Sequence, residues 1–291
     1  MKLTVFTPTY NRRELLTRAY ESLKKQTSKA FEWLIVDDGS TDDTKEFVNK
    51  WIDEDIITIR YHYQNNGGKM RAHNVGAMLA STPLFVCLDS DDYFTDTAVD
   101  DLIKAWDTAY AYAKDTEKLA GIVAHKGKSP TQLLGENDFP IEGETTLYGL
   151  YRSGFKGETT LMFRTDVIRA FPFPEIEGEK YVPEDYIYDK IDKMYCLSVL
   201  PKIITVCEIV GDGYTESLKA LKENNKTAWY LYYEQRARIT PASVLKWKYL
   251  GYYVIYAGRI GKNPFRDTKI PKGWIISWYL GAAMLKLTGK E

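Results

Sequence analysis

Short apolar runs alternate with helix-length amphipathic stretches over the first 90 or so residues, and this alternation constrains the fold more than any other feature of the chain. The apolar runs lie at about residues 3–6, 33–36, 57–61 and 84–88. The stretches between them predict helices that begin near Arg12, Thr44 and Met70. Because strands that alternate with helices form parallel sheets with crossover helices, the sequence predicts an α/β fold.

Polar side chains follow each of the four predicted strands. They are Thr7 and Asn11, Asp37 and Asp38, residues 64–69, and residues 89–92. In open α/β sheets, ligands bind outside the carboxyl ends of the strands. We therefore expect these four groups to meet at one crevice.

The alternation weakens after about residue 115. Residues 126–157 contain several Gly and Pro residues and predict a long loop region. Residues 159–163 and 203–207 predict further strands, and a helix is expected to begin near Glu184. A change in charge and aromatic content places a boundary near residue 215.

Three carboxylates, those of Asp89, Asp91 and Asp92, directly follow the fourth apolar run. Such a concentration of like charge is costly unless a cation neutralises it. Carboxylate oxygens suit Mg²⁺ or Mn²⁺, which proteins bind with one or two carboxylates together with substrate phosphates. A solvated acidic turn before the next helix would explain the same residues, so the motif alone leaves both interpretations open.

A second carboxylate pair, Asp37 and Asp38, ends another strand and is followed by Gly39 and Ser40. One of these carboxylates is suited to accept the imide N–H of a uracil ring while the other braces the turn. Taken alone, the pair would serve equally well as a helix N-cap.

Four motifs stand in the order and spacing typical of one enzyme family. They are Phe6-Thr7-Pro8-Thr9-Tyr10-Asn11-Arg12, Val36-Asp37-Asp38-Gly39-Ser40, Asn66-Gly67-Gly68-Lys69 with Ala72-His73-Asn74-Val75-Gly76, and Asp89-Ser90-Asp91-Asp92. The chain resembles glycosyltransferase family 2 over residues 1–215, most strongly before residue 95. The resemblance implies a GT-A fold, with a Rossmann-like, mostly parallel central sheet flanked by helices. It also implies inverting transfer from a nucleoside diphosphate sugar, for which a UDP-sugar is expected.

The resemblance assigns donor-binding and metal-binding roles to matching positions. Thr7 and Pro8 would pack on the nucleoside, Asp38 would bind the base, and Asp91 would lie near the ribose. Asp92, supported by Asp89, would hold the divalent metal, Mn²⁺ or Mg²⁺. Lys69 and Asn74 match positions that face the nucleotide, although an exposed lysine at a helix start would explain Lys69 nearly as well.

Inversion by direct displacement needs a base that takes the proton of the acceptor hydroxyl. The family's Glu-Asp pair matches Glu184 and Asp185, which implies that Asp185 is the base and that Glu184 lies on the acceptor side. From the residues alone, a favourable interaction of both with a helix N-terminus is the stronger interpretation. Gly157 and Glu158 match an acceptor-side loop, and residues 211–215 resemble a loop over the diphosphate, although such Gly-containing segments are usually only turns.

The Gln-x-x-Arg-Trp motif of processive synthases is incomplete here, because Ile239 follows Gln235 and Arg238 where the motif requires Trp. This departure favours the addition of a single sugar to a hydroxyl of a glycan or a lipid-linked acceptor. We expect residues 1–95 to form a nucleotide-binding half and residues 96–215 an acceptor-binding half of one catalytic domain.

Residues 216–291 predict a helical, aromatic-rich extension. From Trp229 onwards there are 11 Lys or Arg against 3 Asp or Glu, and 13 aromatic residues lie between Trp229 and Tyr279. Trp, Tyr and basic side chains favour the interface of an anionic membrane. Ordinary amphipathic helices that pack on the catalytic domain would show the same pattern, so both interpretations stay open.

The bulk properties narrow the setting. The net charge is only -1, although it is unevenly spread, and no nucleic-acid partner is expected. Three widely spaced cysteines, with neither a signal-peptide pattern nor a spanning apolar run, predict a reduced, cytoplasmic chain, with peripheral contact at the inner face of the cytoplasmic membrane.

Two rival functions fit a similar fold. A nucleotidyltransferase would normally carry a Gly-rich phosphate loop after the first strand, and residues 8–12 contain no Gly. A non-catalytic module that binds sugar nucleotides is the second alternative, and the retained carboxylates of both the metal motif and the base disfavour it.

Overall fold

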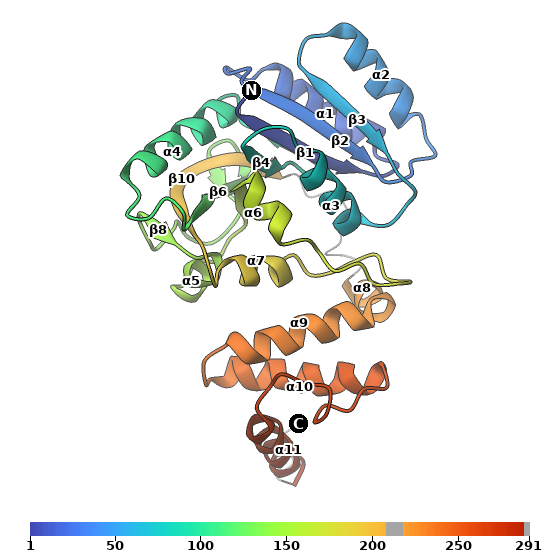
Figure 1. Ribbon diagram of the computed structural model, residues 1–291, viewed down its shortest axis with the longest axis vertical. Coiled ribbons are helices and arrows are strands. Elements are labelled where there is room, and N and C mark those ends of the chain that lie inside the picture. Colours follow the sequence, from blue (N-terminus) through green and yellow to red (C-terminus); the bar gives the residue numbers. More distant parts are fainter. Residues whose placement is uncertain (208–217, 288–291) are drawn as a thin grey trace. The chain divides into compact units, whose positions relative to one another are not determined.

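The computed structural model describes residues 1–207 and 218–287, with side chains described as far as residue 280. The chain forms two compact units (Figure 1). Unit 1 comprises residues 1–173 and 187–211, and unit 2 comprises residues 174–186 and 212–291. The boundary expected near residue 215 lies outside the described residues, and the predicted division into three segments stays a prediction.

Unit 1 is built on one mixed sheet, with the strand order β3-β2-β1-β4-β9-β6-β10-β5. Within the described residues, the strands are β1 (Leu3–Thr9), β2 (Phe31–Asp37), β3 (Ile59–Tyr63), β4 (Leu84–Cys87), β5 (Asp92–Phe94), β6 (Leu119–Ser129), β7 (Gln132–Leu133), β8 (Glu144–Thr145), β9 (Thr159–Arg164) and β10 (Cys196–Cys207). The first four strands pair in parallel, whereas β9 runs antiparallel to both β4 and β6.

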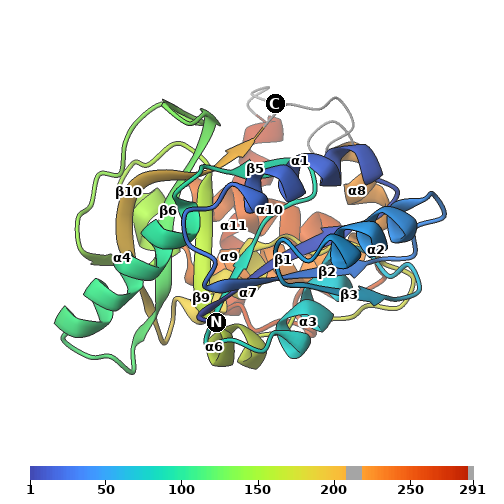
Figure 2. The same ribbon diagram turned by 90° about the horizontal axis from the view of Figure 1, so that it is seen from above.

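Helices cover both faces of the parallel half. The helices that precede β10 in the chain are α1 (Arg13–Lys24), α2 (Thr44–Glu54), α3 (Lys69–Leu79), α4 (Ala98–Tyr112), α5 (Leu147–Arg152), α6 (Thr165–Ala170) and α7 (Asp185–Ile191). Figure 2 shows α1 and α3 on opposite sides of β1. Every residue of β1 and β2 is buried, as expected for strands covered on both faces, although Thr4, Thr7 and Glu32 interrupt their apolar residues.

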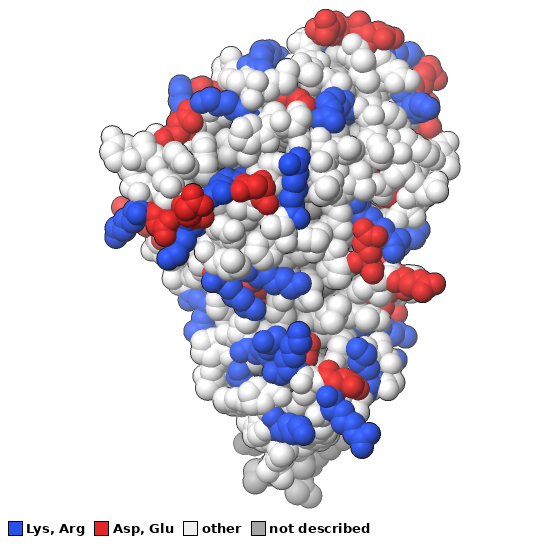
Figure 3. Space-filling view, in the orientation of Figure 1, with Lys and Arg blue, Asp and Glu red and all other residues white. Residues whose placement is uncertain are grey.

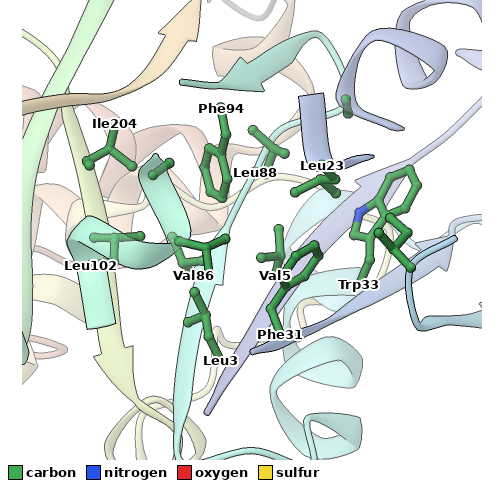
Figure 4. Packing of buried hydrophobic residues seen from close by; sticks show 14 of the residues in the cluster. Leu3, Val5, Leu23, Phe31, Trp33, Val86, Leu88, Phe94, Leu102 and Ile204 are labelled. Carbon is green, nitrogen blue, oxygen red and sulfur yellow. The ribbon is translucent and has the colours of Figure 1, made fainter. Parts of the chain in front are cut away.

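The core of unit 1 lies between the sheet and the helices α1, α2 and α4. Leu3 and Val5 of β1, Trp33 of β2 and Val86 of β4 face this layer, together with Leu23 of α1 (Figure 4). These side chains are at most 2% exposed. The buried strands hold the loops at their carboxyl ends in fixed positions relative to one another.

The prediction of four parallel strands is confirmed, and the observed bounds differ from the predicted ones by three residues or fewer. The expected loop at residues 126–157 is only partly right. Its first residues complete the long strand β6, and the short elements β7, β8 and α5 lie within it. A strand of this length next to Gly and Pro residues was not apparent from the alternation alone.

Unit 2 contains the helices α8 (Leu218–Asn224), α9 (Lys226–Ile239), α10 (Val244–Arg259) and α11 (Lys272–Leu287). Helices α9 and α10 lie side by side (Figure 1). Many of the aromatic residues form the core of this unit, where Tyr230, Tyr233 and Tyr253 are at most 4% exposed. Contact of the remaining ones with a membrane stays a prediction. Among the described residues, no helix is long and apolar enough to cross a bilayer.

Basic side chains gather on the surface of unit 2 (Figure 3). The exposed ones include Lys248, Lys262, Lys269 and Lys272. Lys246, in contrast, is only 6% exposed, and its Nζ donates to the carbonyl of Thr240 over 2.9 Å. Not every basic residue counted in the sequence of this region therefore contributes to the basic surface of unit 2.

Candidate donor and acceptor sites

The loops that follow β1 and β2 are tied together by Asn11. Its Oδ1 accepts hydrogen bonds from the N–H groups of Thr41 at 2.7 Å and Asp42 at 3.3 Å. The backbone N–H of Asn11 donates to Oγ of Ser40 at 2.9 Å. Asn11 has a φ of 51°, a conformation that Asn tolerates better than most residues. These hydrogen bonds hold the polar residues that follow β1 and those that follow β2 at the same edge of the sheet.

The two carboxylates at the end of β2 have different partners. Asp37 accepts from the N–H of Ser40 at 2.7 Å and from the hydroxyl of Tyr61 at 2.6 Å, so it braces the turn. Asp38 accepts from the N–H groups of Gly67 at 2.8 Å and Gly68 at 2.7 Å. Asp38 therefore fixes the loop that leads into α3, and its predicted contact with the base stays a prediction.

Two glycines allow these loops to approach closely. Gly39 has a φ of 88°, and a Cβ built on it would lie 2.8 Å from the backbone N of Asn66. Gly68 has a φ of 93° and directly precedes α3. With Gly at both positions, the loop after β3 can lie against the turn after β2, and α3 begins at Lys69.

Each carboxylate of the Asp89–Asp92 motif has a cationic partner. Nζ of Lys69 lies 2.8 Å from Oδ1 of Asp89, and Nη1 of Arg12 lies 2.9 Å from Oδ2 of Asp91. Nζ of Lys126 lies 2.9 Å from Oδ2 of Asp92. We call these six residues the donor-site cluster. Its members come from four separate segments of the chain, three of which follow the strands β1, β3 and β4, while Lys126 belongs to β6.

Burial and charge act against each other within the donor-site cluster. Burial alone would raise the pKa of Asp89, but Lys69 and Lys126 bring that pKa below its ordinary value. Burial raises the pKa of Asp92, and the neighbouring charge of Asp89 adds to this effect, while Lys126 opposes it. Burial lowers the pKa of Lys126, but Asp92 and Asp89 outweigh it and raise that pKa well above the ordinary value, so Lys126 is charged.

Lys126 is a functional candidate that the sequence does not reveal, because the Gly and Pro residues of 126–157 predict a loop there. It lies on β6, where its N–H donates to the carbonyl of Glu158 over 3.0 Å. Its ammonium also lies 3.8 Å from Oδ2 of Asp89. The three carboxylates predict a nearby cation, and the sequence indication for Lys126 is that it closely follows the apolar run of residues 119–124.

The donor-site cluster fits a divalent metal in one respect. Among the described residues, no three His, Cys, Asp or Glu side chains gather into a ready-made metal site. Mg²⁺, however, is usually bound by one or two carboxylates with substrate phosphates. The oxygens of Asp92 and Asp89 meet that requirement, and Lys126 shares both carboxylates.

The remaining donor-side candidates, Thr7, Pro8 and Asn74, have contacts within the protein. Thr7 is fully buried, and its Oγ1 accepts from Nε1 of Trp33 at 2.9 Å. Pro8 is likewise buried in β1. Asn74 forms two hydrogen bonds with the backbone of Phe173, at 2.9 and 2.8 Å. These contacts are structural, and nucleotide contacts of the three residues stay predictions.

The predicted acceptor-side residues Gly157 and Glu158 lie beside β6. Gly157 forms a bridge with Gly135, and its carbonyl accepts from the hydroxyl of Tyr151 at 3.1 Å. Glu158 is exposed, and its backbone bonds to both Lys126 and Leu134. The segment is thus part of the sheet region rather than a free loop, while residues 211–215 lie outside the described residues.

The predicted base, Asp185, and its neighbour Glu184 belong to unit 2. Oδ2 of Asp185 lies 2.6 Å from Nη2 of Arg236 on α9. Burial raises the pKa of Asp185, Arg236 opposes this shift, and Glu184 adds to it. The predicted helix does begin at Asp185, so the position at a helix start is confirmed and the role of base stays a prediction.

Comparison with known proteins places this geometry in a family. The model of "Glycosyl transferase family 2" matches residues 4–169, more than half of the chain. A validoxylamine A glucosyltransferase from Streptomyces hygroscopicus is 44% identical over 92 residues, which are 30% of this chain and 21% of that protein. A teichoic acid poly(glycerol phosphate) polymerase from Staphylococcus epidermidis is 35% identical over 99 residues, which are 34% of this chain and 14% of that protein.

Solved structures show the same fold. S. aureus TarS 1–349, in complex with UDP-GlcNAc, aligns with a TM-score of 0.62 and 20% identity, over 96% of this chain and 79% of that chain. The mannosyltransferase PcManGT from Pyrobaculum calidifontis, in complex with GDP-Man and Mn²⁺, aligns with a TM-score of 0.55 and 18% identity, over 100% of this chain and 88% of that chain. The fold is therefore GT-A, as the resemblance implied, and the chain belongs to glycosyltransferase family 2.

Proposed function

We propose that this protein is an inverting glycosyltransferase that moves a single sugar from a nucleoside diphosphate sugar, with UDP as the preferred nucleotide, to a hydroxyl of a glycan or lipid-linked acceptor. The donor-site cluster is the observation that supports the proposal most strongly. Its three cationic side chains are drawn together by three carboxylates at the ligand-binding edge of the sheet. A diphosphate bound there would meet Lys69, Lys126 and Arg12.

A divalent metal, Mn²⁺ or Mg²⁺, would be held by Asp92 with Asp89 in support. When bound, such an ion stabilises the negative charge on a leaving diphosphate. Lys69 and Lys126 would contribute further positive charge to the same group, since both are already held beside these carboxylates. The known structure with GDP-Man and Mn²⁺ supports this part of the proposal by its likeness of fold.

Uridine recognition is assigned to the turn after β2. Asp38 holds the loop of Gly67 and Gly68 through its carboxylate, so the base would be read at a turn with a fixed conformation. The known complexes of the related TarS fold with UDP and with UDP-GlcNAc support a uridine donor. Asp91, next to Arg12, would lie at the ribose, and Pro8 would pack on the nucleoside.

Asp185 is assigned as the general base, and Glu184, Gly157 and Glu158 are assigned to the acceptor side. The Asp185 side chain is 47% exposed and bound to Arg236, and its pKa is raised above the ordinary value, mainly by desolvation. A carboxylate with a raised pKa is a stronger proton acceptor than an ordinary aspartate.

A lipid-linked acceptor and the basic surface of unit 2 would both suit an enzyme that binds at a membrane surface. Exposed lysines of α10 and of the segment before α11 would approach anionic headgroups, and the exposed Ile276 and Leu280 would meet the interfacial region. We propose peripheral contact at the inner face of the cytoplasmic membrane on this basis.

The deciding experiment measures donor use. Purified protein is incubated with UDP-, GDP- and CMP-linked sugars, Mn²⁺ and a panel of glycan acceptors, and the release of nucleotide and the mass of the acceptor are followed. We expect nucleotide release that requires both acceptor and metal, with a single sugar added and UDP-sugars preferred. Preference for GDP- or CMP-sugars would overturn the assignment of uridine, and attachment of a nucleotide to a sugar phosphate would overturn the reaction class.

A further inference from the structure

Residues 179–186, which lead up to and include Asp185, contact α9 at both ends of this segment. The first contact is with the start of α9. The carboxylate of Glu179 accepts hydrogen bonds from the N–H groups of Thr227 at 2.7 Å and Ala228 at 2.8 Å. These N–H groups belong to the first turn of α9 and have no partner within the helix. Glu179 therefore binds where the helix dipole favours a negative charge.

Asn225, which directly precedes α9, makes the second contact. Its Oδ1 accepts from the N–H groups of Lys180 at 2.8 Å and Tyr181 at 2.9 Å. Asn225 is only 4% exposed. The backbone of the segment is thereby held against the start of α9 by two buried or partly buried polar groups.

The third contact lies farther along α9, about 13 Å from the first at 1.5 Å per residue. Arg236 binds Asp185 through Nη2 at 2.6 Å, and Nε2 of Gln235 donates to the carbonyl of Tyr186 at 2.9 Å. Arg236 is 9% exposed and Gln235 is 7% exposed. The guanidinium also lies over the ring of Tyr232, 5.4 Å from its centroid. Burying two such side chains is costly unless their polar groups are well bonded.

We propose that Arg236 is a positioning residue that orients the carboxylate of Asp185, so that α9 is part of the catalytic machinery. This inference rests on the proposed function, in which Asp185 is the base. A guanidinium bound to one carboxylate oxygen fixes the orientation of the other, and a base must lie within hydrogen-bond distance of the proton that it takes.

Arg236 also sets the pH at which the base works. The charged groups that act on Asp185 are Arg236 from α9 and Glu184 on its own segment. Arg236 opposes the rise that burial imposes on the pKa of Asp185, so removal of its charge raises that pKa further. Because the base must be deprotonated, activity is lost as the pH falls through this pKa. The acid limb of the pH profile should therefore move to higher pH.

The test compares Arg236→Met and Arg236→Lys with the wild type. For Arg236→Met we expect kcat to fall about 10- to 100-fold, as misplacement of a reacting group does, with the KM for donor and the calorimetric Kd for UDP within about twofold. The acid limb of kcat/KM should move up in pH. Arg236→Lys, which keeps the charge, should restore much of the pH profile and part of kcat. Arg238→Met, an exposed arginine on the same helix, is the matched control and should change none of these values.

Each outcome decides one question. If Asp185→Asn transfers sugar at the wild-type rate, the proposed base is wrong, whatever Arg236 does. If Asp185→Asn abolishes transfer but Arg236→Met leaves both kcat and the acid limb unchanged, the positioning role is wrong. In an Asp185→Asn background, Arg236→Met should cause no further loss of kcat, and a further loss would show that Arg236 acts elsewhere. If circular dichroism shows that Arg236→Met does not fold, the pH profile of Arg236→Lys decides. Because lysine keeps the positive charge, the acid limb of Arg236→Lys should stay near that of the wild type, and an acid limb that moves to higher pH would overturn the proposal.

Discussion

The ammonium of Lys126 lies 2.9 Å from Oδ2 of Asp92 and 3.8 Å from Oδ2 of Asp89. The cation therefore contacts both carboxylates that the sequence assigns to a metal. A strand residue more than thirty positions downstream neutralises the motif in the structure as described. A divalent ion would join a site whose charge is already partly balanced.

Lys126→Met should destabilise the protein and strengthen its response to metal. Removing one partner of a buried ion pair usually costs 3–5 kcal/mol, and we expect about 3 kcal/mol, because Asp89 keeps Lys69. Mn²⁺ should then raise the melting temperature of the variant more than that of the wild type, since the ion neutralises carboxylates that have lost their lysine. Differential scanning fluorimetry with and without Mn²⁺ measures both effects.

Lys128→Met is the control, because Lys128 is exposed on the same strand. It should change the free energy of unfolding by no more than about 0.5 kcal/mol. An equal effect of Mn²⁺ on Lys126→Met and on the wild type would show that metal and lysine do not share these carboxylates.

Asp38→Asn should loosen the loop that positions Lys69. Two backbone N–H groups, those of Gly67 and Gly68, donate to separate oxygens of Asp38, and an amide offers only one oxygen. At least one of the N–H groups that donate to Asp38 is left without its acceptor. This should lower the free energy of unfolding, measured in urea, by about 1–3 kcal/mol. UDP affinity should fall as well, because Lys69 directly follows this loop. Asp43→Asn, on the exposed part of the turn, should stay within about 1 kcal/mol of the wild type.

The basic surface of unit 2 should bind anionic vesicles. Each lysine near such a surface contributes about 1 kcal/mol, so Lys248→Gln, Lys269→Gln and Lys272→Gln together should weaken binding about 100-fold. Cosedimentation with vesicles that contain phosphatidylserine measures this binding. Vesicles of phosphatidylcholine alone should bind neither the wild type nor the triple variant. The matched triple variant Lys45→Gln, Lys50→Gln and Lys114→Gln removes exposed lysines of unit 1 and should bind normally; equal losses for the two triple variants would contradict a site on unit 2.

The parallel half of the fold could be predicted because local pattern and buried strands agree there. The strands that contain Leu3, Trp33 and Leu84 are largely apolar and almost wholly buried. The polar residues Asn11, Asp37 and Asp38 lie where the first two of these strands end. The order and spacing of the motifs then indicated that the Asp89–Asp92 carboxylates belong to the donor site. These features depend on residues close together in the sequence.

The partners of those carboxylates could not be predicted in the same way. Lys126 reaches Asp92 because β6 continues past the point at which Gly and Pro residues suggested a loop, and the pairing of β6 with β9 and β10 extends it. The link between Asp185 and Arg236 likewise joins residues 51 positions apart on a segment and a helix that pack together. Such contacts follow from tertiary packing, which a single sequence does not specify.

The central claim is that a nucleoside diphosphate binds at the donor-site cluster with the help of a metal held by Asp92, and calorimetric titration of UDP with and without Mn²⁺ tests it most directly. For the wild type, we expect Mn²⁺ to tighten UDP binding at least about 10-fold, the equivalent of one charge-assisted contact. Asp92→Asn should keep the fold and the metal-independent part of the affinity but lose the effect of Mn²⁺. If Mn²⁺ tightened UDP binding equally in Asp92→Asn and the wild type, or if UDP did not bind the wild type at all, the account of this site would be contradicted.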